Sequence, residues 1–137
     1  MPLQLTIVTP QGSAYSGEVA SVVLPGSEGD FGVLPSHERL LAPLRIGEVE
    51  IRTGNESIFA AIASGFAEVN GEEVVVMVES CEAAADLDLA RAELARERAE
   101  QGLSALGENE RDRRMAEYEE ALELARNRIA VAKRAQG

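Results

Sequence analysis

The side chains that most often perform catalysis are scarce in this chain. His37 is its only histidine and Cys81 its only cysteine, so a histidine-based triad has one candidate base and no evident nucleophile near it in the sequence. A metal site built from histidine and cysteine lacks ligands. We therefore expect no catalytic residue and no metal site, and we expect Cys81 to be a small buried apolar residue rather than a reactive thiol.

The densest irregular stretch is residues 25–37, where a glycine stands at every third position between two prolines. Glycine-rich loops can cradle phosphate, but no Lys-Ser or Lys-Thr pair follows this one, and Glu28 and Asp30 would repel an anion. Two interpretations remain open. The stretch is either a series of tight turns that join strands or an exposed acidic loop that docks onto a protein partner.

The composition of the chain changes near Ala85, which indicates two differently built units that position these residues. All five prolines and nine of the twelve glycines precede that point, whereas Ala, Leu, Glu and Arg dominate after it. Turn formers and β-branched residues favour a sheet, and straight-chain residues without interior proline favour helices. The sequence predicts a β domain over residues 1–85 and an α-helical domain over residues 86–137.

The charge of the two units differs. The formal net charge is -11, which disfavours binding to a nucleic-acid backbone and direct attachment to anionic lipid. Residues 1–85 carry three arginines against twelve carboxylates, and residues 86–137 carry ten basic against twelve acidic side chains. From the first residues, which begin directly with strand-like alternation, we expect no signal peptide, transit peptide or membrane span. We expect protein partners of different charge for the two units.

In the first unit, apolar and polar residues alternate in short runs separated by turn formers. Asn70-Gly71 is the strongest hairpin signal. Many short strands at close spacing indicate an antiparallel sandwich or barrel. The alternation predicts strands at residues 3–8, 19–24, 44–52, 57–63, 65–69 and 73–79.

The second unit reads as an antiparallel two-helix hairpin. The first helix is expected to begin at Asp86 as its N-cap and to reach about Leu103, and the second to run from about Asn109. Too short to enclose a core, the unit must pack on the sheet, on itself or on a partner, and is a candidate for movement. Three sets of residues carry its pattern: the seam Met115, Tyr118, Leu122, Ala125, Ile129 and Ala132, the stripe Leu87, Ala90 and Leu94, and the small face Ala92, Ala95, Ala99 and Gly102.

Several motifs together, in one order along nearly the whole chain, resemble the epsilon subunit of bacterial F-type ATP synthase. The longest covers residues 22–37 and is followed by Leu40-Leu41 and Gly47-Glu48-Val49. The others are residues 64–69 and residues 87–92. Each motif is weak alone, but their order combined with a sheet-then-hairpin plan is specific.

The resemblance implies a ten-stranded β-sandwich followed by two helices, in a noncatalytic subunit of the central stalk. Its partners would be the gamma subunit and the c-ring, which it couples for proton-driven ATP synthesis, on the cytoplasmic face of the bacterial membrane and without insertion of its own. Three residues match the region that faces the c-ring: Glu28, Asp30 and His37. The neighbouring Phe31, Val33 and Leu34 are expected mainly to pack.

In the family that this chain resembles, the hairpin can also extend into the alpha/beta catalytic head, where it opposes ATP hydrolysis. The basic residues expected to meet acidic surfaces there are Arg111, Arg113, Arg114, Arg126, Arg128, Lys133 and Arg134. For any one of them, a solvated helix face or a pair four residues apart is an equal alternative.

The resemblance also implies a weak regulatory ATP site on the folded hairpin, although no cofactor is required. The matching positions are Glu82, Asp88, Arg91, Ala92, Arg98 and Arg128. Leu124 stands where stronger ATP binders carry a basic residue, and a lost charge-assisted contact costs about 1.5 to 3 kcal/mol. Two other functions stay open: a free-standing ATP-sensing module and an acidic protein-interaction adaptor.

Overall fold

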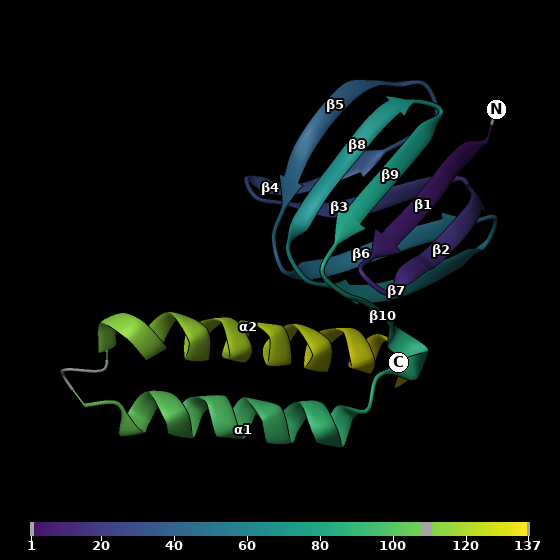
Figure 1. The fold of residues 1–137 in the computed structure, drawn as a ribbon. Coiled ribbons are helices and arrows are strands. Elements are labelled where there is room, and N and C mark those ends of the chain that lie inside the picture. The colour runs from purple at the N-terminus through teal and green to yellow at the C-terminus, as the bar shows by residue number, and fades with distance from the viewer. Residues whose placement is uncertain (1, 108–110, 137) are drawn as a thin grey trace.

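The computed structural model describes residues 2–107 and 111–136, with side chains at 2–107 and 114–135. In this part of the chain, ten strands are followed by a 3-10 turn and two helices (Figure 1). The strands are β1 (Leu3–Thr9), β2 (Gly12–Val19), β3 (Ser21–Gly26), β4 (Gly29–Val33), β5 (His37–Leu44), β6 (Gly47–Thr53), β7 (Glu56–Ile62), β8 (Gly65–Gly71), β9 (Glu73–Val78) and β10 (Cys81–Ala83). The remaining elements are η1 (Ala84–Asp86), α1 (Leu89–Ala105) and α2 (Arg111–Gln136).

The strands form one continuous sheet folded into two layers, which confirms the predicted sandwich. The strand order is β10-β7-β6-β3-β5-β8-β9-β1-β2, with β4 paired to β3. Figure 1 shows β5, β8, β9, β1 and β2 in the layer nearer the viewer. The layers are joined where β3 meets β5 through the single pair Gly26 and Leu44.

One strand pair departs from the antiparallel expectation. β1 lies between β2 and β9 and pairs with β9 in parallel, Gln4 opposite Glu73 and Val8 opposite Met77. A short turn between two strands forces them to run antiparallel. β1 and β9 are neighbours in the sheet but lie far apart along the chain, so no short turn constrains their relative direction.

The core of the sandwich consists of described residues between Leu3 and Cys81. Leu3, Leu5 and Ile7 on β1 are fully buried and alternate with partly exposed residues. The same alternation on β6 buries Val49 and Ile51. Because successive side chains of a strand point to opposite faces, this pattern fills the space between the layers.

The glycine-rich stretch, residues 25–37, contains a strand in addition to turns. It contains β4, which pairs with β3 in a hairpin that sets Val22 opposite Val33. Val33 is buried, as expected, but Leu34 is 64% exposed, so the expectation that Leu34 packs is wrong. It follows β4 directly, in the β4–β5 connection, where the alternation that buries Val33 ends.

A close approach of β8 and β9 requires glycine. A Cβ atom added to Gly65 would lie 2.0 Å from the carbonyl oxygen of Met77. Any side chain would force the two strands apart at this point.

The helical unit begins later than predicted. Asp86 belongs to η1, and α1 is capped by Asp88, whose Oδ1 accepts a 3.1 Å hydrogen bond from the backbone N–H of Arg91. The prediction of Asp86 as the N-cap is therefore wrong, and the next aspartate along the chain, Asp88, has that role. Either side chain could cap a helix, but Asp86 is already part of the 3-10 turn. No helix in the described residues has the length and apolar character needed to cross a membrane.

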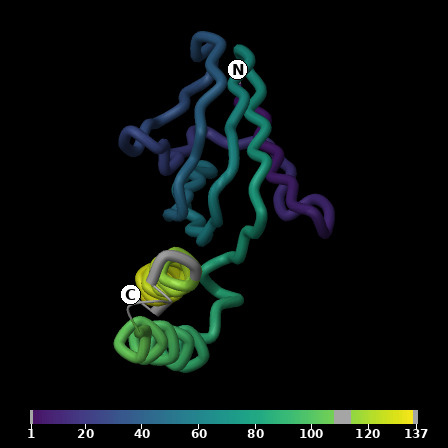
Figure 2. Tube along the Cα trace, turned by 60° about the vertical axis from the view of Figure 1, so that its left-hand side comes forward, coloured from purple at the N-terminus to yellow at the C-terminus, as the bar shows by residue number. Residues whose placement is uncertain are grey.

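The two helices pack along the small face of α1, where Ala92 and Ala99 are buried although Ala95 is exposed. In the predicted stripe, Ala90 and Leu94 are exposed and only Leu87 packs, at the junction with α2 and the sandwich. At Gly102 an added Cβ would lie 2.3 Å from a ring carbon of Tyr118. Small residues allow the close antiparallel approach seen in Figure 2, where α2 lies between α1 and the sandwich.

The seam predicted on α2 is buried toward its C-terminal end. Ala125, Ile129 and Ala132 are buried, but Met115 is 41% exposed. The distal half of the hairpin projects past the sandwich (Figure 1), so side chains there have one helix to pack on rather than a helix and a sheet.

Candidate functional site

A pocket of about 290 Å³ forms where α1, α2 and β10 meet. Five of the six residues predicted for nucleotide binding line it, whereas Arg98 does not. The lining residues are Glu82, Asp86, Leu87, Asp88, Arg91, Ala92, Ala95 and Arg128. The folded hairpin therefore brings together residues that lie up to 46 positions apart in the chain.

The charges of this pocket are largely matched within the protein. Arg128 Nε donates a 2.7 Å hydrogen bond to Glu82 Oε1, and Asp88 caps α1 through the backbone of Arg91. The lining holds three carboxylates and two guanidinium groups. An incoming phosphate would have to compete with Glu82 for Arg128 and would meet the repulsion of the other carboxylates.

Three polar side chains on one face of α2 bind the sandwich. Besides Arg128, Asn127 Nδ2 donates a 2.8 Å hydrogen bond to the Gly47 carbonyl, and Arg134 Nε lies 3.2 Å from Glu48. The Arg134 guanidinium also lies 4.9 Å from the centre of the Phe59 ring, within the range of a cation–π interaction. These contacts fix the hairpin on β6, β7 and β10.

An apolar contact completes this junction. Val131 is fully buried and clusters with the buried Ala61 and Ala84, while Phe59 and Leu87 pack around them. We call Asn127, Arg128, Val131 and Arg134 the docking strip. Its members are three or four residues apart, or adjacent, so they share one side of the helix.

The basic residues predicted to meet the catalytic head do not form one surface. Arg128 and Arg134 are paired with sandwich carboxylates, whereas Arg126 and Lys133 are exposed. Arg114 Nη2 donates a 2.7 Å hydrogen bond to the Tyr118 hydroxyl. The side chains of Arg111 and Arg113 lie outside the described residues.

The residues predicted to face the c-ring are divided between the two ends of β4. Glu28 and Asp30 lie on the β3–β4 hairpin, where Asp30 forms an ion pair with Arg45. His37 begins β5 opposite Gly71, and its Nδ1 lies 2.7 Å from the Glu38 carbonyl oxygen. The acidic pair and the histidine therefore occupy different parts of the sandwich surface.

An exposed apolar patch lies on the outer face of β5, β8 and β9. Leu41, Phe66 and Met77 are 66%, 53% and 42% exposed, and Phe66 is opposite both Met77 and Pro43 in the sheet. Sequence reasoning missed this patch. The available signal was the presence of large apolar residues at outward positions of strands whose other face was already apolar.

Comparison with known proteins identifies the family. Residues 2–84 match the family described as ATP synthase, Delta/Epsilon chain, beta-sandwich domain. The ATP synthase epsilon chain of Halalkalibacterium halodurans is 38% identical over 96% of this chain and 98% of its own length. That of Desulforamulus reducens is 39% identical over 94% of this chain and 96% of its own length.

The chain belongs to the ATP synthase epsilon chain family. Its fold also matches a chain in a cryo-EM structure of the Euglena gracilis mitochondrial ATP synthase, with a TM-score of 0.80, 24% identity, and coverage of 98% of this chain and 81% of the other. The likeness of fold therefore includes the helical unit as well as the sandwich.

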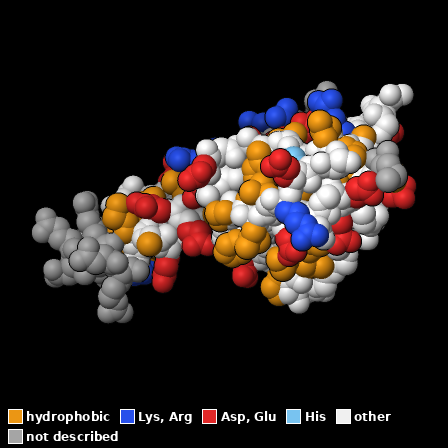
Figure 3. All heavy atoms as spheres, turned by 90° about the horizontal axis from the view of Figure 1, so that it is seen from above, with side chains coloured by type: hydrophobic (Ala, Val, Ile, Leu, Met, Phe, Trp, Pro, Cys, Tyr) orange, Lys and Arg blue, Asp and Glu red, His pale blue; other side chains and the backbone are white. Residues whose placement is uncertain are grey.

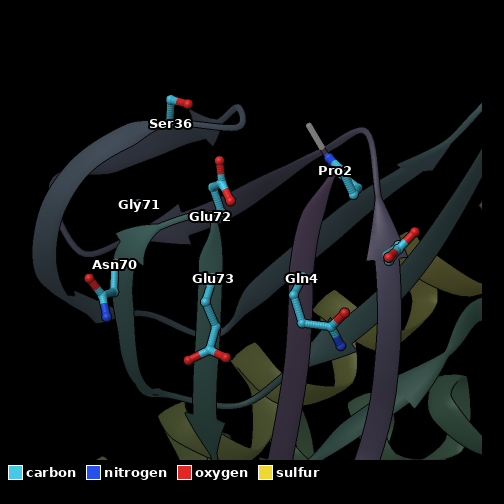
Figure 4. Close-up of a pocket in the computed structure, with 8 residues that line it drawn as sticks. Pro2, Gln4, Ser36, Asn70, Gly71, Glu72 and Glu73 are labelled. Atoms are coloured by element: carbon cyan, nitrogen blue, oxygen red, sulfur yellow. The ribbon is translucent and has the colours of Figure 1, made fainter.

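A hollow of about 740 Å³ lies at the end of the sandwich remote from the helices in this epsilon chain family member. Glu18, Glu72 and Glu73 line it, and the last two are labelled in Figure 4. None of the predicted site residues lines it. Groups of three or more side chains able to hold a metal ion do not occur among the described residues.

The basic side chains on the face shown in Figure 3 are dispersed, and the single thiol is half-buried. Seen from above, the basic side chains lie in small separate groups among hydrophobic and acidic ones (Figure 3). Burial, together with the nearby Glu82 carboxylate, raises the pKa of the Cys81 thiol from 9.0 to about 11. Cys81 packs against the sandwich core, and at neutral pH it is protonated and a poor nucleophile.

Proposed function

We propose that this chain is the noncatalytic central-stalk subunit of an F-type ATP synthase, coupling the gamma subunit to the c-ring in proton-driven ATP synthesis. The observation that carries the proposal is the identity of 38% to an ATP synthase epsilon chain over nearly the full length of both proteins. The two-part architecture agrees with it. A peripheral position on the cytoplasmic face of the bacterial membrane, held by its partners, follows from this role.

In this proposal the sandwich makes the permanent contacts with the gamma subunit and the c-ring. Leu41, Phe66 and Met77 form an apolar patch of the kind that marks a protein interface, and we assign it to gamma. Glu28 and Asp30, exposed on the β3–β4 hairpin, face the c-ring. Since Asp30 is already paired with Arg45, Glu28 is the carboxylate more available to a polar or basic ring loop.

The hairpin supplies regulation. Its exposed basic residues Arg126 and Lys133, with the others of the predicted set, meet acidic surfaces of the catalytic head and oppose ATP hydrolysis. Neutralising the set together is expected to weaken inhibition without unfolding the sandwich, because the core lies between Leu3 and Cys81.

The test is ATP hydrolysis by an epsilon-depleted catalytic core that contains gamma, titrated with the full chain and with a chain ending at Ala85. Binding by both and inhibition by the full chain alone would support docking by the sandwich and regulation by the helices. Failure of both chains to bind the core would refute the proposal. Binding without inhibition by either would leave a coupling subunit whose hairpin has another role.

A second candidate function is weak regulatory ATP binding at the hairpin. The specific observation is the pocket that brings together Glu82, Asp88, Arg91, Ala92 and Arg128. The ion pair of Arg128 with Glu82 and the absence of a cation at Leu124 both predict weak binding. Calorimetric titration with MgATP should give a dissociation constant well above the micromolar range, and a micromolar value would overturn the prediction of weakness.

A further inference from the structure

The hairpin is held on the sandwich by a small contact. α2 lies between α1 and the sandwich (Figure 2), and the side-chain hydrogen bonds between the described part of α2 and the strands come from the docking strip at its C-terminal end. The apolar part is Val131 against Ala61 and Ala84, with Phe59 and Leu87 packed around them. Because the two alanines offer little apolar area and Phe59 and Leu87 are only partly buried, burial alone provides a modest stabilisation of the docked state.

Ion pairs therefore have a large share in docking. Arg128 pairs with Glu82 and Arg134 with Glu48, and each joins the helix to a strand more than 40 residues away in the chain. The guanidinium side chains are 34% and 54% exposed. Pairs at this exposure are weakened by salt, unlike the neutral hydrogen bond from Asn127 to Gly47 or the burial of Val131.

We propose that Glu48 and Glu82 form an electrostatic latch that keeps the hairpin docked and withholds Arg128 and Arg134 from other acidic surfaces. The proposal rests on the proposed function where it concerns the catalytic head. Each guanidinium already donates its Nε–H to a sandwich carboxylate, so a partner's carboxylate must compete for that donor and for the charge of the arginine. The sandwich carboxylates thus compete with the partner for the same two cations.

The latch has two consequences. The docked hairpin needs no nucleotide, since Glu82 occupies Arg128 from within the chain. The apparent affinity of the hairpin for an acidic partner equals its intrinsic affinity multiplied by the fraction of molecules that are undocked, so weakening the latch strengthens partner binding. Substitutions in the sandwich, remote from the catalytic head, are therefore expected to increase inhibition.

The first measurement tests docking alone. Hydrogen–deuterium exchange of η1 and of residues 127–135 is compared in the parent chain, the Glu48→Gln/Glu82→Gln variant and a matched Glu50→Gln/Glu56→Gln control. Glu50 binds Arg52 and Ser57 on the same sheet, and Glu56 is exposed in β7. The latch variant should exchange about twofold to tenfold faster, the range expected for two exposed pairs, and the control should match the parent.

Salt provides a second arm of this measurement. Raising the ionic strength from about 0.05 M to 1 M shortens the Debye length from roughly 14 Å to 3 Å. Exchange should accelerate in the parent and in the control, and much less in the latch variant. Equal exchange in all three proteins, or an equal response to salt, would overturn the latch.

The second measurement links docking to inhibition. The same three proteins are titrated into the epsilon-depleted core, and the latch variant should inhibit hydrolysis at a concentration lower by the factor found in exchange. Faster exchange with unchanged inhibition would overturn the withholding of the two arginines. If the parent does not bind the core at all, the proposed function fails, while the exchange result still decides whether the latch exists.

Discussion

Removing two methyl groups from Val131 should undock the hairpin without weakening either helix. Val131 is fully buried against the sandwich. Transfer of about 0.8 kcal/mol per methyl group, with a small cavity left behind, gives a loss of about 2 kcal/mol for Val131→Ala. That loss corresponds to roughly a 30-fold higher ratio of undocked to docked molecules, at about 1.4 kcal/mol for each factor of ten.

Native-state hydrogen exchange of η1 and the C-terminal half of α2 measures this ratio. Alanine has a higher intrinsic helix propensity than valine, so faster exchange cannot be ascribed to a weaker helix. The control is Met115→Ala, which also truncates an apolar side chain of α2, but one that is 41% exposed. Its exchange at the junction should stay close to that of the parent.

The reasoning would be refuted by a Val131→Ala variant whose η1 and α2 amides exchange within about twofold of the parent. Such a result would mean that the junction collapses around the cavity or that the polar contacts of the docking strip alone hold the hairpin. A uniform rise throughout the sandwich would instead show that the two units unfold together.

Three further predictions concern other parts of the molecule. Gly102→Ala should destabilise the hairpin by about 1 kcal/mol in urea denaturation, because overpacking against Tyr118 outweighs the propensity of alanine, and the added Tyr118→Ala should remove the penalty. Phe66→Glu should weaken binding to a gamma-containing core at least about tenfold by surface plasmon resonance, with an unchanged melting temperature, since Phe66 is 53% exposed; unchanged binding would place gamma elsewhere. At pH 8, Cys81 should react with iodoacetamide about 100-fold more slowly than in the urea-unfolded chain, because its pKa is raised from 9.0 to about 11. The protonated thiol stabilises the fold fully below pH 9, and this contribution is lost as the pH rises toward 11; equal alkylation rates would contradict the burial.

The local pattern of the sequence predicted the elements whose periodicity is strong. Alternation at Leu3, Leu5 and Ile7 identified β1, and Asn70-Gly71 identified the turn between β8 and β9. Weak alternation concealed β2, the glycines of residues 25–37 concealed β4, and the predicted set also lacked β5 and β10. These strands are stabilised by pairing with neighbours rather than by their own propensity.

The exposed patch and the docking strip illustrate what local pattern leaves undecided. Phe66 reads as a strand residue in either orientation, and only its place on the outer face of β8, opposite Met77, makes it a surface contact. Arg128 and Arg134 read as two more cations on a solvated helix. Their carboxylate partners lie 46 and 86 positions away, beyond the reach of any spacing rule.

The sequence by itself determined the division of the chain near Ala85, a sheet of many short strands and the hairpin, and its motifs indicated the family. Those features depend on period, turn chemistry and composition, which act over a few residues. Only the tertiary structure decided that β1 runs parallel to β9, that the small face of α1 packs on α2, and that Glu48 and Glu82 bind the arginines of α2. These outcomes arise from contacts between segments far apart in the chain, where distance and burial decide which of several compatible partners is met.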